Sequence, residues 1–236
     1  MRTVAVVLAG GAGLRLGGAV PKQFQLLGGK TLLEHSVAAF DEAPSVDDLV
    51  VVLPAAFMAQ GAEILGDRYA KIRKIIRGGA DRQGSTRSAI KLISQWGDGD
   101  CNVLFHDAAR PLVDQRIIAD CVTGLQEHLA LGVVVPTADT IVALDGNAMV
   151  SVPPRESLGR CQTPQGFRLS VIRRAYQLAA ADPAKYAATD DCGMVLRYLP
   201  SIEVRTIPGS ERNLKITYAA DLRIAESFFG SGPAKL

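Results

Sequence analysis

The chain has 236 residues, of which 48% are hydrophobic and 21% charged, and its formal net charge is +2. This balance is typical of a globular protein that buries roughly 70% of its unfolded surface, and it excludes a disordered chain. The small net charge argues against a nucleic-acid partner. No apolar run approaches the roughly 18 residues that span a bilayer, and no signal-peptide cleavage site is evident, so we expect a cytoplasmic protein without a membrane partner.

The cysteines are scattered along the chain, without CxxC pairs or histidines at zinc spacing. They are Cys101, Cys121, Cys161 and Cys192. We therefore expect buried, reduced thiols rather than a disulfide framework or a zinc site.

Short apolar runs alternate with helical patterns along the chain. The runs predict strands at Thr3–Leu8, Leu49–Leu53, Ile72–Ile76, Val103–His106, Gly132–Pro136 and Glu203–Ile207. The helical patterns lie at Thr31–Phe40, Ala56–Tyr69, Gly84–Trp96, Gln115–Leu129 and Ser170–Ala180. Continuous apolar strands joined by helices predict a three-layer, Rossmann-like α/β fold with a mostly parallel sheet. Ligands of such sheets bind at the carboxyl ends of the strands.

One stretch, residues 137–162, breaks this alternation. It has the pattern of a hairpin around a turn at Asp145-Gly146-Asn147, and then Pro153-Pro154 where a helix is due. We expect a single domain over residues 1–236 with a protruding β-arm at 137–162. Such an arm would leave Ile141, Val142 and Val150 uncovered, which favours a homodimer.

The first strand opens into a glycine-rich loop within "VVLAGGAGLRLGGAVPKQF", residues 6–24. A Walker A loop ending at Gly29-Lys30-Thr31 would need glycine where the chain has Phe24, and a Rossmann fingerprint would need glycine at Leu16. The remaining interpretation is a cradle of backbone N–H groups for phosphates, with Arg15 and Lys22 neutralising charge. The alternative is an ordinary surface loop.

Several motifs together carry a family resemblance. "LAGGAGLRL" and "PKQF" resemble the signature loop of sugar-phosphate nucleotidyltransferases. In chain order follow "GGADRQGS" (78–85), "HDAARP" (106–111), "QTPQGF" (162–167), "TDD" (189–191) and "NLKIT" (213–217). With them the chain resembles the 2-C-methyl-D-erythritol 4-phosphate cytidylyltransferase family over nearly its whole length.

The resemblance implies transfer of CMP from CTP to a polyol phosphate, 2-C-methyl-D-erythritol 4-phosphate, in the non-mevalonate isoprenoid pathway. It implies Mg²⁺ or another divalent cation, held chiefly by the CTP phosphates and near Asp107. The catalytic residues implied are Arg15, Lys22, Arg155 and Lys215. The nucleotide-binding residues implied are Ala9, Gly10, Gly11, Gly13, Gly79, Arg82, Ser85, Asp107 and Ala108. Those implied for the polyol phosphate are Asp107, Arg110, Thr140, Arg155, Thr163, Thr189 and Lys215, with Thr140 and Arg155 serving the partner subunit.

Simpler interpretations of single residues remain open. Asp107 could cap the next helix, Ser85, Thr163 and Thr189 could be caps or loop residues, and Lys215 could be a strand-end charge. Arg155 could be a surface charge, since the family's acid before this arginine is a proline here. His35, His106 and His128 are expected to be structural.

Two other functions also remain open. One is a cytidylyltransferase for another alcohol phosphate, such as ribitol 5-phosphate, or for a phosphonate. The other is a non-catalytic nucleotide-binding protein of the same fold, against which the joint presence of Arg15, Lys22 and Lys215 argues.

Overall fold

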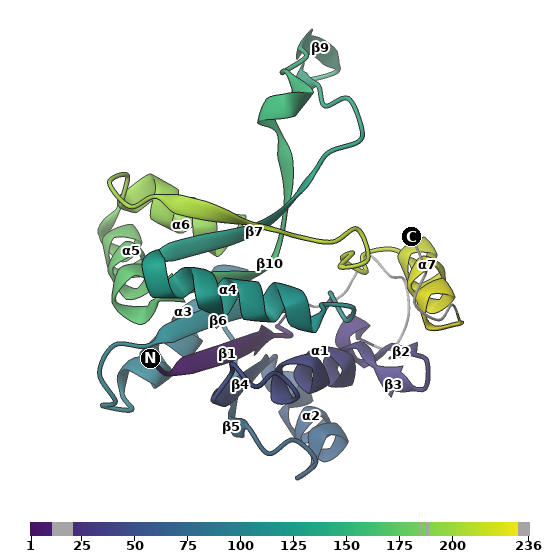
Figure 1. Cartoon of the computed structure of the whole chain (residues 1–236), viewed down its shortest axis with the longest axis vertical. Coiled ribbons are helices and arrows are strands. Elements are labelled where there is room, and N and C mark those ends of the chain that lie inside the picture. The colour runs from purple at the N-terminus through teal and green to yellow at the C-terminus, as the bar shows by residue number, and fades with distance from the viewer. Residues whose placement is uncertain (11–20, 185, 187–188, 231–236) are drawn as a thin grey trace.

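A seven-stranded sheet forms the centre of the protein (Figure 1). The structure is a computed structural model that describes residues 1–10, 21–184, 186 and 189–230. The strand order is β11-β7-β10-β6-β1-β4-β5. The strands are β1 (Thr3–Leu8), β4 (Asp48–Leu53), β5 (Ile72–Arg77), β6 (Asn102–Asp107), β7 (Ala130–Pro136), β10 (Gly159–Arg168) and β11 (Val204–Pro208).

The pairing confirms a mostly parallel sheet. Neighbouring strands run parallel except at β10, which is antiparallel to both β6 and β7. All six predicted strands are present, with ends shifted by a few residues, whereas β10 was not predicted. The chain runs from β1 outward through β4 and β5 and then returns to β6 on the other side of β1. In sheets with such a reversal, ligands bind in the crevice at the carboxyl ends of the strands beside it, which are β1 and β6 here.

Helices cover both faces of the sheet because successive strand residues point to opposite sides. On β1, Ala5 and Val7 pack with α1 (Leu32–Asp41), α2 (Met58–Leu65) and α4 (Gln115–Glu127). Val4 and Val6 face the other core, with α3 (Arg82–Ser94), α5 (Leu169–Ala181) and α6 (Asp191–Tyr198). A smaller cluster joins α7 (Ala219–Gly230) to the β2 (Leu26–Leu27) and β3 (Lys30–Thr31) ribbon. In the described ranges no helix is long and apolar enough to cross a membrane.

Capping side chains fix where several of the helices begin. Thr31 and Glu34 form a reciprocal capping box at α1, and Asp114 accepts the N–H of Ile117 at α4. Asp81 caps α3, so that helix begins at Arg82 and not at the expected Gly84. The helix expected at Ala56–Tyr69 is a 3₁₀ turn followed by the shorter α2, while α6 and α7 were not predicted.

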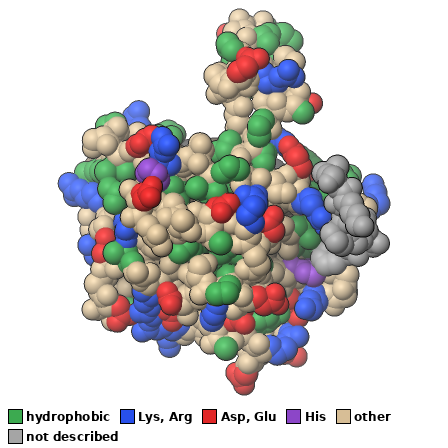
Figure 2. Space-filling view, in the orientation of Figure 1, with side chains coloured by type: hydrophobic (Ala, Val, Ile, Leu, Met, Phe, Trp, Pro, Cys, Tyr) green, Lys and Arg blue, Asp and Glu red, His purple; other side chains and the backbone are tan. Residues whose placement is uncertain are grey.

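The arm stands off the body between β7 and β10 (Figure 1). Its hairpin pairs β8 (Ala143–Asp145) with β9 (Ala148–Ser151), and Gly146 at the turn has φ +55°, as the turn signal predicted. The end expected at Gln162 is wrong, because pairing with β7 already resumes at Gly159. Hydrophobic side chains gather on the arm's surface in Figure 2; they include Ile141, Leu144, Met149, Val150 and Val152, each 43–64% exposed.

The cysteines are all unpaired, and three are buried as expected. The fourth, Cys161, is exposed, which corrects that expectation. It lies on β10 near the point where this strand leaves the sheet for the arm, so less of the chain covers it.

Candidate active site

Asp107 lies at the centre of the site, at the carboxyl end of β6. Its carboxylate oxygens accept Lys215 Nζ at 2.7 Å and Arg82 Nε at 3.2 Å. Burial alone would raise the pKa of Asp107, but the charges of Arg82 and Lys215 outweigh it and hold that pKa well below its usual range. The carboxylate is therefore ionised. Asp107 does not cap the next helix, because Asp114 caps α4. Lys215 is more than a strand-end charge, because its ammonium binds the buried carboxylate of Asp107.

Arg82 has a second anionic partner in Asp191, the first residue of α6. Arg82 Nη1 lies 2.8 Å from Asp191 Oδ2, although out of line for a hydrogen bond. The other oxygen of Asp191 accepts the Tyr176 hydroxyl at 2.6 Å, and the Asp191 side chain is fully buried. Burial would lower the pKa of Arg82, but Asp191 and Asp107 together raise it. Two carboxylates thus fix this guanidinium at the entrance of α3.

His106 and Thr163 form a buried hydrogen-bond chain behind the site. The Asp107 N–H donates to Thr163 Oγ1 at 3.1 Å, and that oxygen lies 3.1 Å from His106 Nδ1. His106 Nε2 lies 3.1 Å from the Arg110 carbonyl, so we assign the ring proton to Nε2 and the hydroxyl proton of Thr163 to the bond with Nδ1. Burial lowers the pKa of His106 to about 4. A structural role for His106 agrees with this geometry, and Thr163 positions the Asp107 backbone.

Arg110 is held inside the protein. Its Nη1 donates to the Asn213 carbonyl at 2.8 Å and its Nη2 to the Cys161 carbonyl at 3.2 Å. Asn213 is fully buried and donates through Nδ2 to the Thr163 carbonyl at 2.9 Å. These bonds fasten the segment that carries Lys215 to β6 and β10. Arg110 therefore shapes the site, and both of these nitrogens are engaged with the protein's own backbone.

The loop after β5 packs tightly against the start of the glycine-rich loop. Ser85 Oγ lies 2.7 Å from where a Cβ on Gly10 would stand and 2.6 Å from one on Gly78. A Cβ on Gly79 would meet the Gly84 Cα at 2.5 Å. Only glycines permit this approach. Ser85 donates to the Asp81 carbonyl at 2.9 Å and does not cap α3, so the helix-cap alternative for it is wrong.

Gln165 connects β10 to the start of α6. Its Oε1 accepts the N–H of Asp191 at 2.9 Å, and its Nε2 donates to Asp190 Oδ2 at 2.9 Å. Asp190 caps α6 by accepting the N–H of Gly193. Thr189 is thus not the cap, and it lies exposed just before the helix.

The structure gathers most of the predicted residues at this edge. Ala9 and Ala108 continue β1 and β6, with the Ala108 N–H donating to the Leu8 carbonyl at 3.0 Å. The residues it brings to the crevice are Ala9, Gly10, Gly79, Arg82, Ser85, Asp107, Ala108, Arg110, Thr163 and Lys215.

Other predicted residues lie on other elements of the chain. Lys22 begins a 3₁₀ turn, η2 (Lys22–Phe24). Thr140 and Arg155 lie on the arm, where Arg155 Nη1 donates to the Ala138 carbonyl at 3.1 Å. The expectations for Gly11, Gly13 and Arg15 concern positions outside the described residues.

Sequence reasoning missed the supporting side chains. From the sequence alone, no role is assigned to Asp191, Asn213, Gln162 or Gln165. The available signal was their place in quoted motifs: the two glutamines lie in "QTPQGF" and Asn213 opens "NLKIT".

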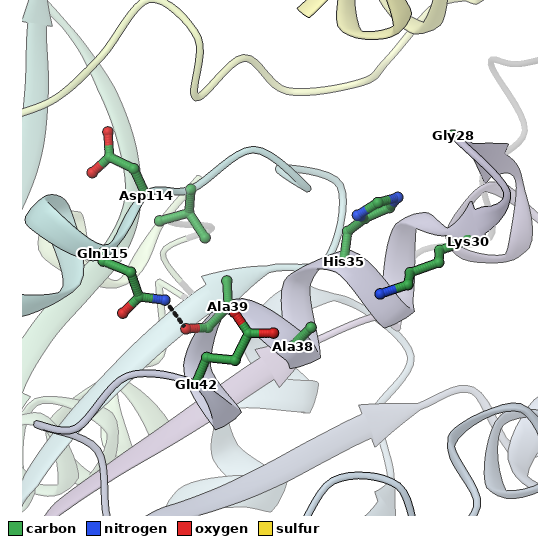
Figure 3. Close-up of a pocket in the computed structure, with 9 residues that line it drawn as sticks. Gly28, Lys30, His35, Ala38, Ala39, Glu42, Asp114 and Gln115 are labelled. Carbon is green, nitrogen blue, oxygen red and sulfur yellow. Dashed lines mark hydrogen bonds between the residues drawn. The ribbon is translucent and has the colours of Figure 1, made fainter. Parts of the chain in front are cut away.

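An open groove of about 510 Å³ lies apart from this site, along α1 and the start of α4 (Figure 3). Gln115 Nε2 donates to the Ala39 carbonyl at 2.7 Å across it. None of the predicted site residues lines this groove.

Metal ligands are sparse. Among the described residues, no group of three or more His, Cys, Asp or Glu side chains could hold a metal ion. Both oxygens of Asp107 already contact cationic side chains. The described residues therefore do not fit a metal held by protein side chains alone.

Comparisons with known proteins identify the family to which the chain belongs. The family model for 2-C-methyl-D-erythritol 4-phosphate cytidylyltransferase matches residues 3–231. The enzyme of that name from Thermobifida fusca is 50% identical, over 99% of this chain and 96% of its own. A bifunctional ribulose 5-phosphate reductase/CDP-ribitol pyrophosphorylase from Haemophilus influenzae is 35% identical over 98% of this chain, which spans 48% of that protein. The crystal structure of the Thermus thermophilus cytidylyltransferase superposes with a TM-score of 0.76 at 30% identity, covering 98% of this chain and all of that one. The chain therefore belongs to the 2-C-methyl-D-erythritol 4-phosphate cytidylyltransferase family, whose members are nucleotidyltransferase enzymes.

Proposed function

We propose that this chain transfers CMP from CTP to the phosphate of 2-C-methyl-D-erythritol 4-phosphate, in isoprenoid biosynthesis. A phosphate oxygen of the polyol attacks the α-phosphorus of CTP; one P–O bond forms while the bond to the β-phosphate bridge breaks and pyrophosphate leaves. The nucleophile is already an anion, so no strong general base is needed. The barrier lies in bringing anions together and stabilising charge on the α-phosphate, which positioned cations can do.

The observation that carries this proposal is the group formed by Asp107, Arg82 and Lys215 at the crevice between β1 and β6. Lys215 pairs with a buried carboxylate, yet its side chain is 42% exposed. It can therefore turn its ammonium from Asp107 toward an incoming phosphate without breaking the fold. We assign Lys215 to the phosphate of the polyol, and Arg15 with Lys22 to the phosphates of CTP.

Mg²⁺ or another divalent cation belongs to this proposal as a companion of CTP. When bound, it would neutralise phosphate charge, and Mg²⁺ is usually held by phosphates and water with only one or two carboxylates. The proposed transfer needs no metal ligand from Asp107, because both oxygens of this carboxylate contact Arg82 and Lys215.

A homodimer through the arm is also part of the proposal. The exposed apolar side chains of the arm have no cover within one chain, and uncovered apolar patches mark interfaces. Thr140 and Arg155 would then reach the partner's crevice. We place the protein in the cytoplasm, because unpaired thiols are typical of reducing compartments, and we propose no nucleic-acid partner at a net charge of +2.

A second candidate substrate is ribitol 5-phosphate, because the Haemophilus influenzae relative is named for CDP-ribitol. The deciding experiment measures pyrophosphate release with CTP and a panel of polyol phosphates. We expect methylerythritol phosphate to be turned over fastest. Faster turnover of ribitol 5-phosphate would transfer the assignment to that substrate, and no turnover of any polyol phosphate would refute a cytidylyltransferase.

A further inference from the structure

Cys161 and Cys192 lie on one face of the sheet, beside the active site. Cys161 on β10 is paired with Val134 on β7, so the two side chains share a face, and Gly132 lies two residues before Val134 on that same face. Cys192 Sγ lies 3.2 Å from where a Cβ on Gly132 would stand. Because Gly132 has no side chain, the thiol of Cys192 occupies the space next to Cys161.

One side chain bridges the two cysteines. Gln165 Nε2 donates to Cys161 Sγ at 3.1 Å, and Gln165 Oε1 accepts the N–H of Cys192 at 3.3 Å. The Cys192 thiol donates to the Leu131 carbonyl at 3.5 Å, on the strand β7 that pairs with Cys161. The neighbouring Cys192 lowers the pKa of Cys161, while the neighbouring Cys161 and burial raise the pKa of Cys192. Cys161 is thus the better nucleophile, and it is the exposed one of the two.

We propose that Cys161 and Cys192 form a redox-active dithiol that hydrogen peroxide converts to a reversible disulfide. The Cys161 thiolate attacks a peroxide oxygen, an S–O bond forms, the O–O bond breaks, and the leaving hydroxide becomes water. The sulfur of Cys192 then attacks that of Cys161; an S–S bond forms, the S–O bond breaks, and a second water carries away the Cys192 proton. Both thiols are oxidised, one peroxide is reduced, and a dithiol reverses the reaction by exchange.

The disulfide would join β10 to the first turn of α6. The strand carries Gln162 and Thr163 behind the site, and the helix begins with Asp191, the buried partner of Arg82. This modification lies beyond the transferase reaction and does not depend on it.

The test is peptide mapping of the reduced full-length protein after hydrogen peroxide, alkylation of remaining thiols and trypsin digestion. Cleavage after Arg160, Arg168, Lys185 and Arg197 places the two cysteines in the separate peptides 161–168 and 186–197. We expect these peptides to be linked within one chain and released by dithiothreitol. Burial raises the pKa of Cys101 to about 11 and of Cys121 to about 12, so these two cysteines are internal controls. We expect Cys101 and Cys121 to be oxidised at least roughly tenfold more slowly than Cys161.

Two variants sharpen the result. In Cys192→Ser the resolving thiol is gone, so we expect dimedone to trap a sulfenic acid at Cys161, while Cys101→Ser should keep the cross-link. The wild-type mapping does not depend on either variant folding. Absence of the 161–168 to 186–197 link, a link only between two chains, or equal oxidation of Cys101 and Cys121 would each overturn the proposal.

Discussion

His106 makes the stability of the protein depend on pH near neutrality. It is fully buried, and its pKa is lowered to about 4, against roughly 6.5 in the unfolded chain. Between these values the unfolded state binds the proton and the native state does not, so the free energy of unfolding falls as the pH falls. The pKa difference corresponds to about 3 kcal/mol below the native pKa, of which about 2 kcal/mol is lost between about pH 7.5 and about pH 5. Asp107 contributes only at lower pH, because its depressed pKa matters only below the ordinary aspartate pKa of about 3.9.

The assay is urea unfolding at several pH values across this window, with His106→Gln and the control His128→Gln. Glutamine can keep a donor toward the Arg110 carbonyl and an acceptor toward Thr163 but cannot titrate. We expect the free energy of unfolding of the wild type and of His128→Gln to fall by about 2 kcal/mol toward pH 5. His106→Gln should be less stable at neutral pH, but its free energy of unfolding should fall much less toward pH 5. If the free energy of unfolding of His106→Gln depends on pH as steeply as that of the wild type, another group causes the pH dependence. A titration of the His106 ring by NMR gives the same answer without a variant, and a pKa near 6.5 would refute the argument.

Three further predictions test the site and the arm. Lys22→Ala should lower turnover by about 10²-fold or more while nucleotide binding is largely kept, as single-turnover kinetics and calorimetry would show; unchanged turnover contradicts its role. Leu144→Glu should shift a dimer toward monomers in light scattering, whereas Leu196→Glu, an equally exposed position on α6, should not. Asp191→Asn leaves a buried charge short of a partner and should cost about 3 kcal/mol, or a Tm drop of about 6–12 °C. The control Asp120→Asn, at an exposed ion pair, should cost less than about 1 kcal/mol. Equal Tm values for the two variants would contradict the role of Asp191 in holding Arg82.

The strands with continuous apolar runs could be predicted from the sequence, because burial on both faces leaves a plain signal. The strand β10 could not. Its sequence holds two glutamines and Pro164, which favour a loop. The structure accommodates the proline at an irregularity between Gln162 and Gln165, and both glutamine side chains are buried in hydrogen bonds. A polar strand at the centre of a sheet gives no hydrophobic pattern because its side chains bind backbone groups of other segments.

The site was found from motifs, and its internal contacts were not. Lys215 and Asp107 are 108 residues apart, and no local pattern announces that their side chains meet at 2.7 Å. Asp191 is the sharper case. An acid in the first turn of a helix satisfies a local electrostatic preference, so the sequence left nothing about it to explain. Yet a solvated acid would suffice for that preference, whereas Asp191 is fully buried between Arg82 and Tyr176. Burying a carboxylate is costly unless a cation and a donor offset it, so this burial points to the need to fix Arg82. A residue that satisfies a local rule can thus hide a long-range role, and only its burial distinguishes the two.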